Sequence, residues 1–240
     1  MNDDQSPSDL ADSFLKTLRS RRSVRSFSDR PVPQVLIETL IATAGTAPSG
    51  ANKQPWRFVA VQDADLKRRI RLAAEAEERK LYESRANEDW LTDLAPLGTN
   101  ADKPFLEEAP WLVVIFKLNR DDEPVRKTDQ VYYVNESVGI ATGMFLAAAQ
   151  VAGLSTLTHT PSPMKFLGEV LGRPEHERAY MVIPVGYPAP DSSSPDLERK
   201  PLERIMVVDD GAAPNSSDPK RSLPSSMAPD QRDGLAGSPE

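Results

Sequence analysis

Hydrophobic residues are spaced as in a helix in some segments of this chain and follow one another without interruption in others. After Pro33, apolar side chains recur at helical spacing as far as Gly45, which predicts a helix there. The same spacing predicts helices over residues 64–85, 131–152 and 164–171. Apolar runs predict strands over residues 56–61, 111–118, 154–160 and 180–186. The expected fold class is therefore α+β, a mixed central sheet flanked by helices.

The two ends of the chain differ in composition from the middle. Residues 1–10 and the Pro/Ser-rich residues 209–240 contain almost no large apolar side chains, so we expect both to be disordered around one folded domain, 11–208. Residues 75–102 are highly charged, which fits either a mobile flap over a site or a solvated helix and connector. Residues 196–208 form an apolar arm without a nearby partner in sequence, and such an arm often packs against a neighbouring subunit.

Composition excludes several classes of protein. A net charge of −7 argues against general binding to nucleic acid or anionic membrane, so an anion site must be a local cluster of cations. The absence of cysteine excludes disulfides, thiolate catalysis and cysteine metal sites, and His159 and His176 are too few for an all-histidine site. The N-terminus has no signal-peptide pattern, and apolar stretches fall short of the ~20 residues that cross a bilayer. We expect a cytoplasmic protein.

A short basic segment is the first candidate for chemistry. Three guanidinium groups and a hydroxyl lie within five residues: Arg21, Arg22, Ser23, Val24 and Arg25. Arginine presents paired donors that match phosphate oxygens, so this segment is suited to a phosphate dianion. A surface basic patch, or a contact with nucleic acid, explains the same pattern.

Two further segments could contact a flat ligand. Ser49 offers a hydroxyl, Gly50 permits close approach of the backbone, and the amide of Ala51 is a potential donor. Thr158 and Thr160 offer hydroxyls on either side of His159. Taken alone, these segments are more commonly an ordinary loop and a structural histidine. No serine has a nucleophile-elbow pattern, which excludes a Ser–His–acid triad.

Glu78, Tyr82 and Lys103 form a third candidate set. The first two are four residues apart and share one helix face, and the lysine follows twenty-one residues later. A carboxylate, a phenol and an ammonium could bind a zwitterion, with Glu78 receiving the ammonium and the other two the carboxylate. A solvent-exposed charged face is the alternative.

Taken in order along the chain, these motifs resemble the FMN-dependent nitroreductase superfamily, and within it the iodotyrosine deiodinase subgroup. The resemblance spans about residues 18–208. The motifs that carry it are the basic segment, AGTAPSGA at 44–51, QPW at 54–56, WLTDL at 90–94, NE at 135–136, LGRP at 171–174, PVGYP at 184–188 and PDLERKPL at 195–202. Each motif is moderately specific, whereas the ordered set is specific.

The resemblance implies a domain-swapped homodimer with an FMN site at each subunit interface. It assigns the FMN phosphate and pyrimidine edge to residues 21–25, with Ser49 nearby and Arg199 completing the phosphate site from the second subunit. Thr158, His159 and Thr160 would line the flavin, with a threonine hydroxyl bound to N5 and Thr160 as the catalytic residue. Glu78, Tyr82, Lys103 and the backbone N–H of Ala51 would bind the substrate.

The implied activity is reductive dehalogenation of iodotyrosine or bromotyrosine with electrons from NAD(P)H. The cofactor supplies the chemistry, so no side chain has to act as a nucleophile, which fits the absence of cysteine. His159 departs from the family, which has a threonine there, and we expect no counterpart of the N-terminal membrane anchor that the vertebrate members carry. Two other hypotheses stay open: a general nitroreductase acting on nitroaromatics or quinones, and a non-enzymatic anion-binding protein that contacts nucleic acid.

Overall fold

A computed structural model of the chain describes residues 6–85, 89, 92, 94, 96, 98–122, 128–195 and 197–209. It divides into two compact units, Met1–Asp196 and Leu197–Glu240, which are described separately. The sequence predicts instead one folded domain as far as residue 208. Most of the WLTDL motif, and the predicted tail apart from Asp209, lie outside the described residues.

The first unit is built on a four-stranded sheet. Its strands follow the order β1 (Trp56–Val61), β2 (Trp111–Leu118), β4 (Glu177–Gly186) and β3 (Ser155–Thr156). All three strand pairs are antiparallel, so the expectation of a mixed sheet is wrong for the named strands. A single parallel bridge, Ser23 to Thr156, places the basic segment beside β3 at the sheet edge.

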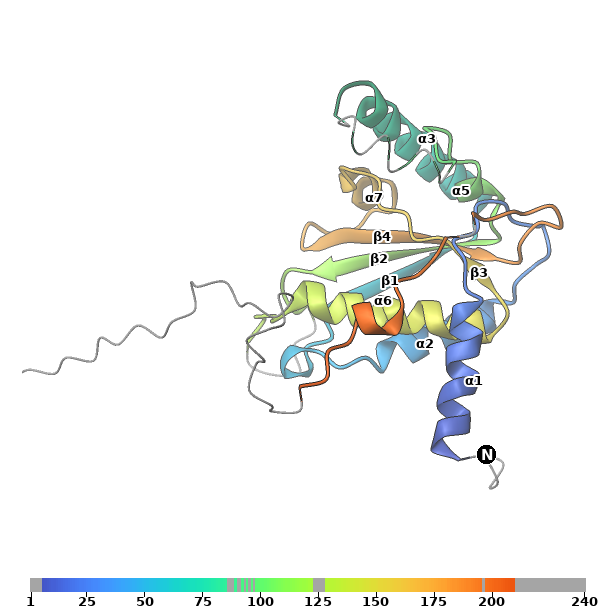
Figure 1. The fold of residues 1–240 in the computed structure, drawn as a ribbon. Coiled ribbons are helices and arrows are strands. Elements are labelled where there is room, and N and C mark those ends of the chain that lie inside the picture. The colour runs from blue at the N-terminus through green and yellow to red at the C-terminus, as the bar shows by residue number, and fades with distance from the viewer. Residues whose placement is uncertain are drawn as a thin grey trace, which may run out of the picture. The chain divides into compact units, whose positions relative to one another are not determined.

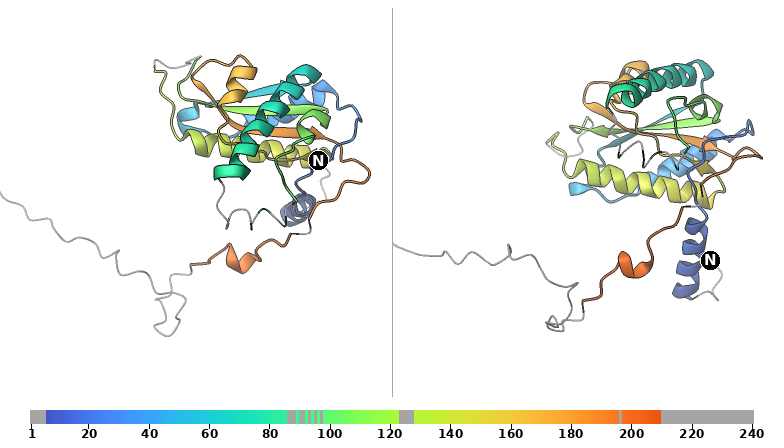
Figure 2. Two further views of the ribbon diagram at one scale, coloured as in Figure 1. Left: turned by 90° about the horizontal axis from the view of Figure 1, so that it is seen from above. Right: turned by 45° about the horizontal axis from the view of Figure 1, so that its top comes forward.

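Helices cover both faces of this sheet (Figure 1). α2 (Gln34–Gly45) and α6 (Val134–Val151) lie on one face, and α3 (Ala64–Lys80), α5 (Phe105–Glu108) and α7 (Lys165–Val170) lie on the other. Figure 2 shows α3 and α7 side by side, and α3 also contacts α5.

Every residue of β2 except Lys117 is apolar, and the surroundings of the strand explain this pattern. Leu112, Val114 and Phe116 belong to the core cluster that includes α3 and α7, whereas Val113 and Ile115 belong to the cluster that includes α2 and α6. Because successive side chains of a strand point to opposite faces, a strand covered on both sides has apolar residues at consecutive positions, as residues 111–116 do here. The predicted strands at 56–61 and 111–118 are confirmed.

The N-terminal helix α1 (Pro7–Arg19) begins inside the stretch predicted to be disordered. The Ser6 hydroxyl accepts the Asp9 backbone N–H at 3.2 Å, and the Asp9 carboxylate accepts the Ser6 backbone N–H at 3.0 Å. This capping box stabilises the first turn. α1 has no buried residue, and the large apolar side chains of Leu10, Phe14 and Leu15 are exposed.

The charged segment after α3 differs in detail from the prediction. α3 ends at Lys80 and continues as a π-helical turn, η2 (Leu81–Arg85). Much of the proposed flap beyond it lies outside the described residues. The four-residue helix α5 is too short to have been predicted, and β3 is shorter than expected. In the described part of the chain, every helix is too short or too polar to cross a membrane.

The second unit carries exposed apolar side chains around a short 3-10 helix, η4 (Leu202–Arg204). The exposed residues are Leu197, Leu202, Ile205, Met206, Val207 and Val208. Whether this arm packs against a neighbouring subunit stays a prediction.

Candidate functional site

The basic segment is fixed against the sheet edge by its backbone. The Val24 N–H donates to the Thr156 carbonyl at 3.2 Å, and the Val24 side chain is buried. The Ser194 hydroxyl donates to the Ser23 carbonyl at 3.2 Å. Arg22 Nη1 donates to the carbonyl of Arg19 at 2.8 Å, so part of this guanidinium stabilises the local turn.

Residues 158–160 run alongside β4 and present two different faces. His159 exchanges two backbone hydrogen bonds of 3.0 Å with Val182. Thr158 and Thr160 are exposed, whereas the His159 ring lies edge-on against the ring of Phe105, with the centroids 5.6 Å apart. Alternation along an extended chain explains this arrangement. The threonine hydroxyls remain accessible while the histidine packs inward.

His159 lies within electrostatic reach of two other predicted site residues. Burial of its ring, and then the charges of Lys103 and Arg25, lower its pKa from 6.5 to about 3. Its Nε2 is buried without a hydrogen-bond partner. The imidazole is therefore neutral at physiological pH. The fold thus gathers the basic segment, residues 158–160 and Lys103, which are far apart in sequence.

The lowered pKa of His159 predicts a pH-dependent loss of stability. Below pH 6.5 the unfolded chain binds a proton at this position that the folded chain does not bind, so stability falls as the pH falls towards 3. Between pH 7 and 4.5 the expected loss in the free energy of unfolding is roughly 2–3 kcal/mol.

The variant His159→Gln should lack this loss. Denaturant unfolding at both pH values is expected to show a smaller decrease for the variant than for the unaltered protein. The lowered pKa values of Glu75, Asp122 and Glu177 add acid sensitivity to both proteins and cancel in the comparison. Equal decreases would show that the ring is not desolvated.

Glu78, Tyr82 and Lys103 come together as a compact, largely buried cluster. Glu78 and Lys103 are 7% and 2% exposed, and Lys103 Nζ lies 3.2 Å from Glu78 Oε2. The same nitrogen lies 5.8 Å from the centre of the Tyr82 ring and contacts the Thr99 hydroxyl and the Asn100 carbonyl. A buried ion pair is inconsistent with the solvent-exposed face considered above. The geometry is that of a charge-paired site.

The loop before β1 has an unusual backbone. Ala51, Asn52 and Gln54 all have positive φ, at 51°, 54° and 48°. The Ser49 hydroxyl stabilises this conformation by accepting the Gln54 N–H at 2.9 Å. Left-handed backbone at non-glycine residues costs about 1–3 kcal/mol each and is found mainly at functional sites.

Glycine is required at position 50. A Cβ there would lie 2.9 Å from the Tyr132 Cβ and from the Tyr132 carbonyl oxygen. The close approach of the two segments therefore depends on the missing side chain.

Ala51 and Arg199 are two further predicted site residues. Ala51 lines a cavity of about 360 Å³ together with Lys53 and Asp121, whose ion pair is 3.1 Å long. Among the described residues, no hydrogen bond or ion pair joins Ala51 to Glu78, Tyr82 or Lys103. Arg199 belongs to the second unit, in the segment that precedes η4.

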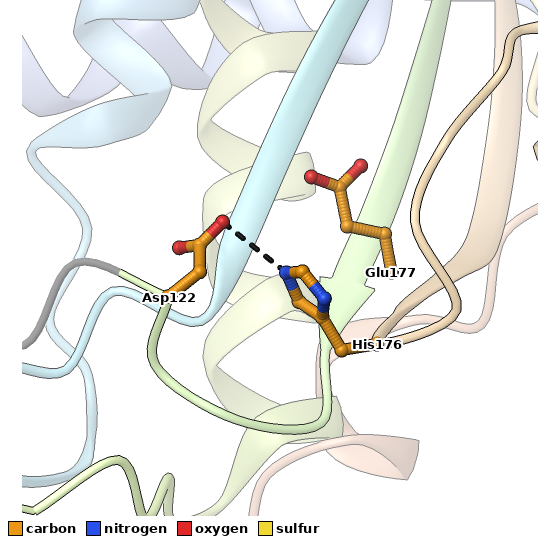
Figure 3. Close-up of side chains that lie close together, drawn as sticks. All are labelled: Asp122, His176 and Glu177. Atoms are coloured by element: carbon orange, nitrogen blue, oxygen red, sulfur yellow. Dashed lines mark hydrogen bonds and ion pairs between the residues drawn. The ribbon is translucent and has the colours of Figure 1, made fainter.

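Asp122, His176 and Glu177 form a group that sequence reasoning missed (Figure 3). His176 Nε2 lies 3.3 Å from Asp122 Oδ2, and all three residues offer ligand atoms to a common point. Arginines already bind the carboxylates, because Arg57 lies 2.6 Å from Asp122 and Arg173 donates two bonds to Glu177 at 2.6 and 2.7 Å. We interpret the group as an ion-pair network that ties the ends of the strands together.

The donor set fits a phosphorylated flat ligand. Arginine side chains at the sheet edge provide cations, Thr158 and Thr160 provide accessible hydroxyls, and His159 Nε2 is an unpartnered polar atom beside them. A flavin mononucleotide has a phosphate dianion and a ring edge of hydrogen-bonding atoms, which these groups can satisfy.

Known proteins match most of the chain. The nitroreductase family model matches residues 18–187. Iodotyrosine deiodinase of Haliscomenobacter hydrossis is 54% identical over 195 residues, which cover 81% of this chain and 88% of the relative. Iodotyrosine deiodinase 1 of Homo sapiens is 48% identical over 198 residues, covering 81% and 68%. A crystal structure of oxidized iodotyrosine deiodinase bound to FMN and 3-iodo-L-tyrosine aligns with a TM-score of 0.69 and 29% identity, covering 81% of this chain and 100% of the other.

Proposed function

This chain belongs to the nitroreductase family of FMN-dependent oxidoreductases, and from that premise we propose that it removes the halogen from iodotyrosine. The products are tyrosine and halide, and bromotyrosine is a second proposed substrate. The observation that carries the proposal is the buried cluster of Glu78, Tyr82 and Lys103, which suits the amino-acid end of such a substrate. The alternative of a non-enzymatic anion-binding protein is wrong, because the family consists of enzymes.

The pairing of Glu78 with Lys103 supports a zwitterionic substrate. Each charge is buried and has the other as its partner, so the cluster is neutral without a ligand. A zwitterion brings one charge of each sign, and both residues can then exchange an internal partner for a substrate partner. A ligand with only one charge would leave either Glu78 or Lys103 buried and unpaired, which is strongly unfavourable.

The cofactor site would draw on residues from both ends of the folded region. Residues 21–25 and Arg199 would hold the FMN phosphate, Ser49 would lie nearby, and residues 158–160 would line the ring with Thr160 near N5. When bound, FMN supplies the electrons for cleavage of the carbon–halogen bond. The overall reaction consumes two electrons and one proton, forms a carbon–hydrogen bond and releases halide. NAD(P)H is the proposed donor of these electrons.

The protein's own residues would orient the substrate and exclude water. Glu78 would accept the substrate ammonium, whereas Tyr82 and Lys103 would bind the carboxylate. The backbone N–H of Ala51 would donate to the phenolate oxygen, and the positive φ of this residue sets the direction of that N–H. Fixing both ends of the substrate would hold its ring in one orientation.

A homodimer is part of the proposal. Two exposed apolar features support it: α1, with Leu10, Phe14 and Leu15, and the arm around η4. Exposed apolar side chains are stabilised when another surface buries them, and a second copy of the chain carries the same two apolar features to pack against. In such a dimer Arg199 and Ala51 would contribute to the site of the neighbouring subunit.

The experiment that tests the proposal is a titration of the purified yellow protein with iodotyrosine. Stacking of the substrate on the flavin is expected to quench flavin fluorescence, with saturation. A nitroaromatic serves as the comparison ligand. Flavin fluorescence that responds to the nitroaromatic and not to iodotyrosine would favour a general nitroreductase.

A further inference from the structure

One face of α3 carries charged side chains at every fourth position, and each contacts the segment 102–109. The contacts join Lys67 Nζ to the Ala109 carbonyl at 2.7 Å, Arg71 Nε to Glu107 at 2.6 Å, Glu75 Oε1 to the Lys103 N–H at 2.9 Å and Arg79 to Asp102 at 3.9 Å. Residues four apart share one helix face, so this row aligns the segment along the helix. The register of the segment is thereby fixed.

Glu75 is the member of this row that contacts a predicted substrate residue. Its side chain is buried, with the residue 4% exposed, and Oε1 accepts the backbone N–H of Lys103. Arg71 Nη1 donates to both carboxylate oxygens at 3.0 Å. These bonds compensate for the burial of the charge and leave the carboxylate little freedom to move.

Glu75 and Glu78 hold different parts of the same lysine. The two glutamates are three residues apart on α3, so they point to the same side of the helix. Glu75 binds the backbone of Lys103, and Glu78 binds its ammonium at 3.2 Å. The distance between the ammonium of Lys103 and the carboxylate of Glu78 therefore depends on where Glu75 holds the chain.

We propose that Glu75, held by Arg71, is a positioning residue for substrate recognition, which sets the spacing of the Glu78 and Lys103 charges without touching the substrate. The inference rests on the proposed function. A misplaced Lys103 backbone moves the ammonium relative to Glu78, and the two ends of a zwitterion then no longer meet both charges. The affinity for amino-acid substrates should fall while chemistry at the flavin on other acceptors continues.

The test compares three variants in the flavin-loaded protein. Glu75→Ala removes both the charge and the acceptor for the Lys103 N–H, whereas Glu75→Gln keeps an acceptor oxygen. Glu107→Gln is the matched control, because it removes a partner of Arg71, and within the described residues no hydrogen bond or ion pair joins Glu107 to Lys103. Iodotyrosine affinity is measured by flavin quenching, and the rate of nitroaromatic reduction is measured on the same samples.

Glu75→Ala is expected to raise the Kd of iodotyrosine at least tenfold, and Glu75→Gln about threefold to tenfold. Glu107→Gln should stay within twofold of the unaltered protein, and nitroaromatic reduction should stay within twofold in all three variants. If Glu75→Ala does not fold, the comparison of the iodotyrosine Kd between Glu75→Gln and Glu107→Gln decides the test. Equal Kd values for the Glu75 and Glu107 variants, or a parallel loss of nitroaromatic reduction, would overturn the inference. If the unaltered protein does not bind iodotyrosine, the proposed function fails, and this inference fails with it.

Discussion

Replacing Glu78 with glutamine is expected to weaken iodotyrosine binding by about 30- to 1,000-fold. The substitution keeps the size of the side chain and removes its charge, so the substrate ammonium would lose its proposed partner. Removing one member of a buried, hydrogen-bonded charge pair costs roughly 2–4 kcal/mol, and this free energy converts to the stated range in Kd. Lys103 would also keep a buried charge without a counter-ion.

The matched control for this variant is Glu83→Gln, a change of the same type at an exposed position five residues further along the chain. Its Kd should equal that of the unaltered protein. Flavin quenching by iodotyrosine measures all three proteins, and the ratio of flavin to protein absorbance shows whether each still holds FMN. If Glu78→Gln bound iodotyrosine as well as Glu83→Gln does, the zwitterion site would have to lie elsewhere.

Loss of two arginines from the basic segment should have an effect of similar size on the cofactor. In the proposed site, the double variant Arg21→Gln/Arg25→Gln would remove two charge-assisted contacts to phosphate, each worth roughly 1.5–3 kcal/mol. Affinity for FMN should therefore fall by about 10²- to 10⁴-fold. The purified variant is expected to be colourless, and titration of the protein with FMN measures the change in Kd.

Arg120→Gln provides the comparison, because this exposed arginine lies in the turn after β2, away from the segment. That variant should be purified with the flavin content of the unaltered protein. A double variant that retains a full complement of flavin would remove residues 21–25 from the phosphate site. Retained riboflavin binding with lost FMN binding would show directly that the arginines recognise the phosphate.

Much of the sheet could be predicted from the sequence because its signals are local. β2 is apolar at every position except Lys117 because α-helical layers cover both of its faces. The antiparallel pairing of β4 with β2 depends on contacts between residues about seventy positions apart, which local spacing does not reveal. α5 has four residues and no helical repeat to detect.

The candidate site was predictable only in part, for a similar reason. Spacing places Glu78 and Tyr82 on one helix face, but the approach of Lys103 depends on tertiary packing. Glu75 was missed because its partner is a backbone N–H, and any residue at position 103 other than proline offers that donor. The spacing of Arg71 and Glu75, four apart on a helix, was the available signal. His159 reads from sequence as a lone histidine, and only its buried, cation-flanked ring shows that it stays neutral.

The most direct measurement is a single turnover without oxygen. The bound flavin is reduced, one equivalent of iodotyrosine is added, and the flavin spectrum is recorded while tyrosine and iodide are quantified. The proposed function predicts one tyrosine and one iodide for each flavin that returns to the oxidised state. Flavin that stays reduced with iodotyrosine, yet is reoxidised by a nitroaromatic, would contradict it.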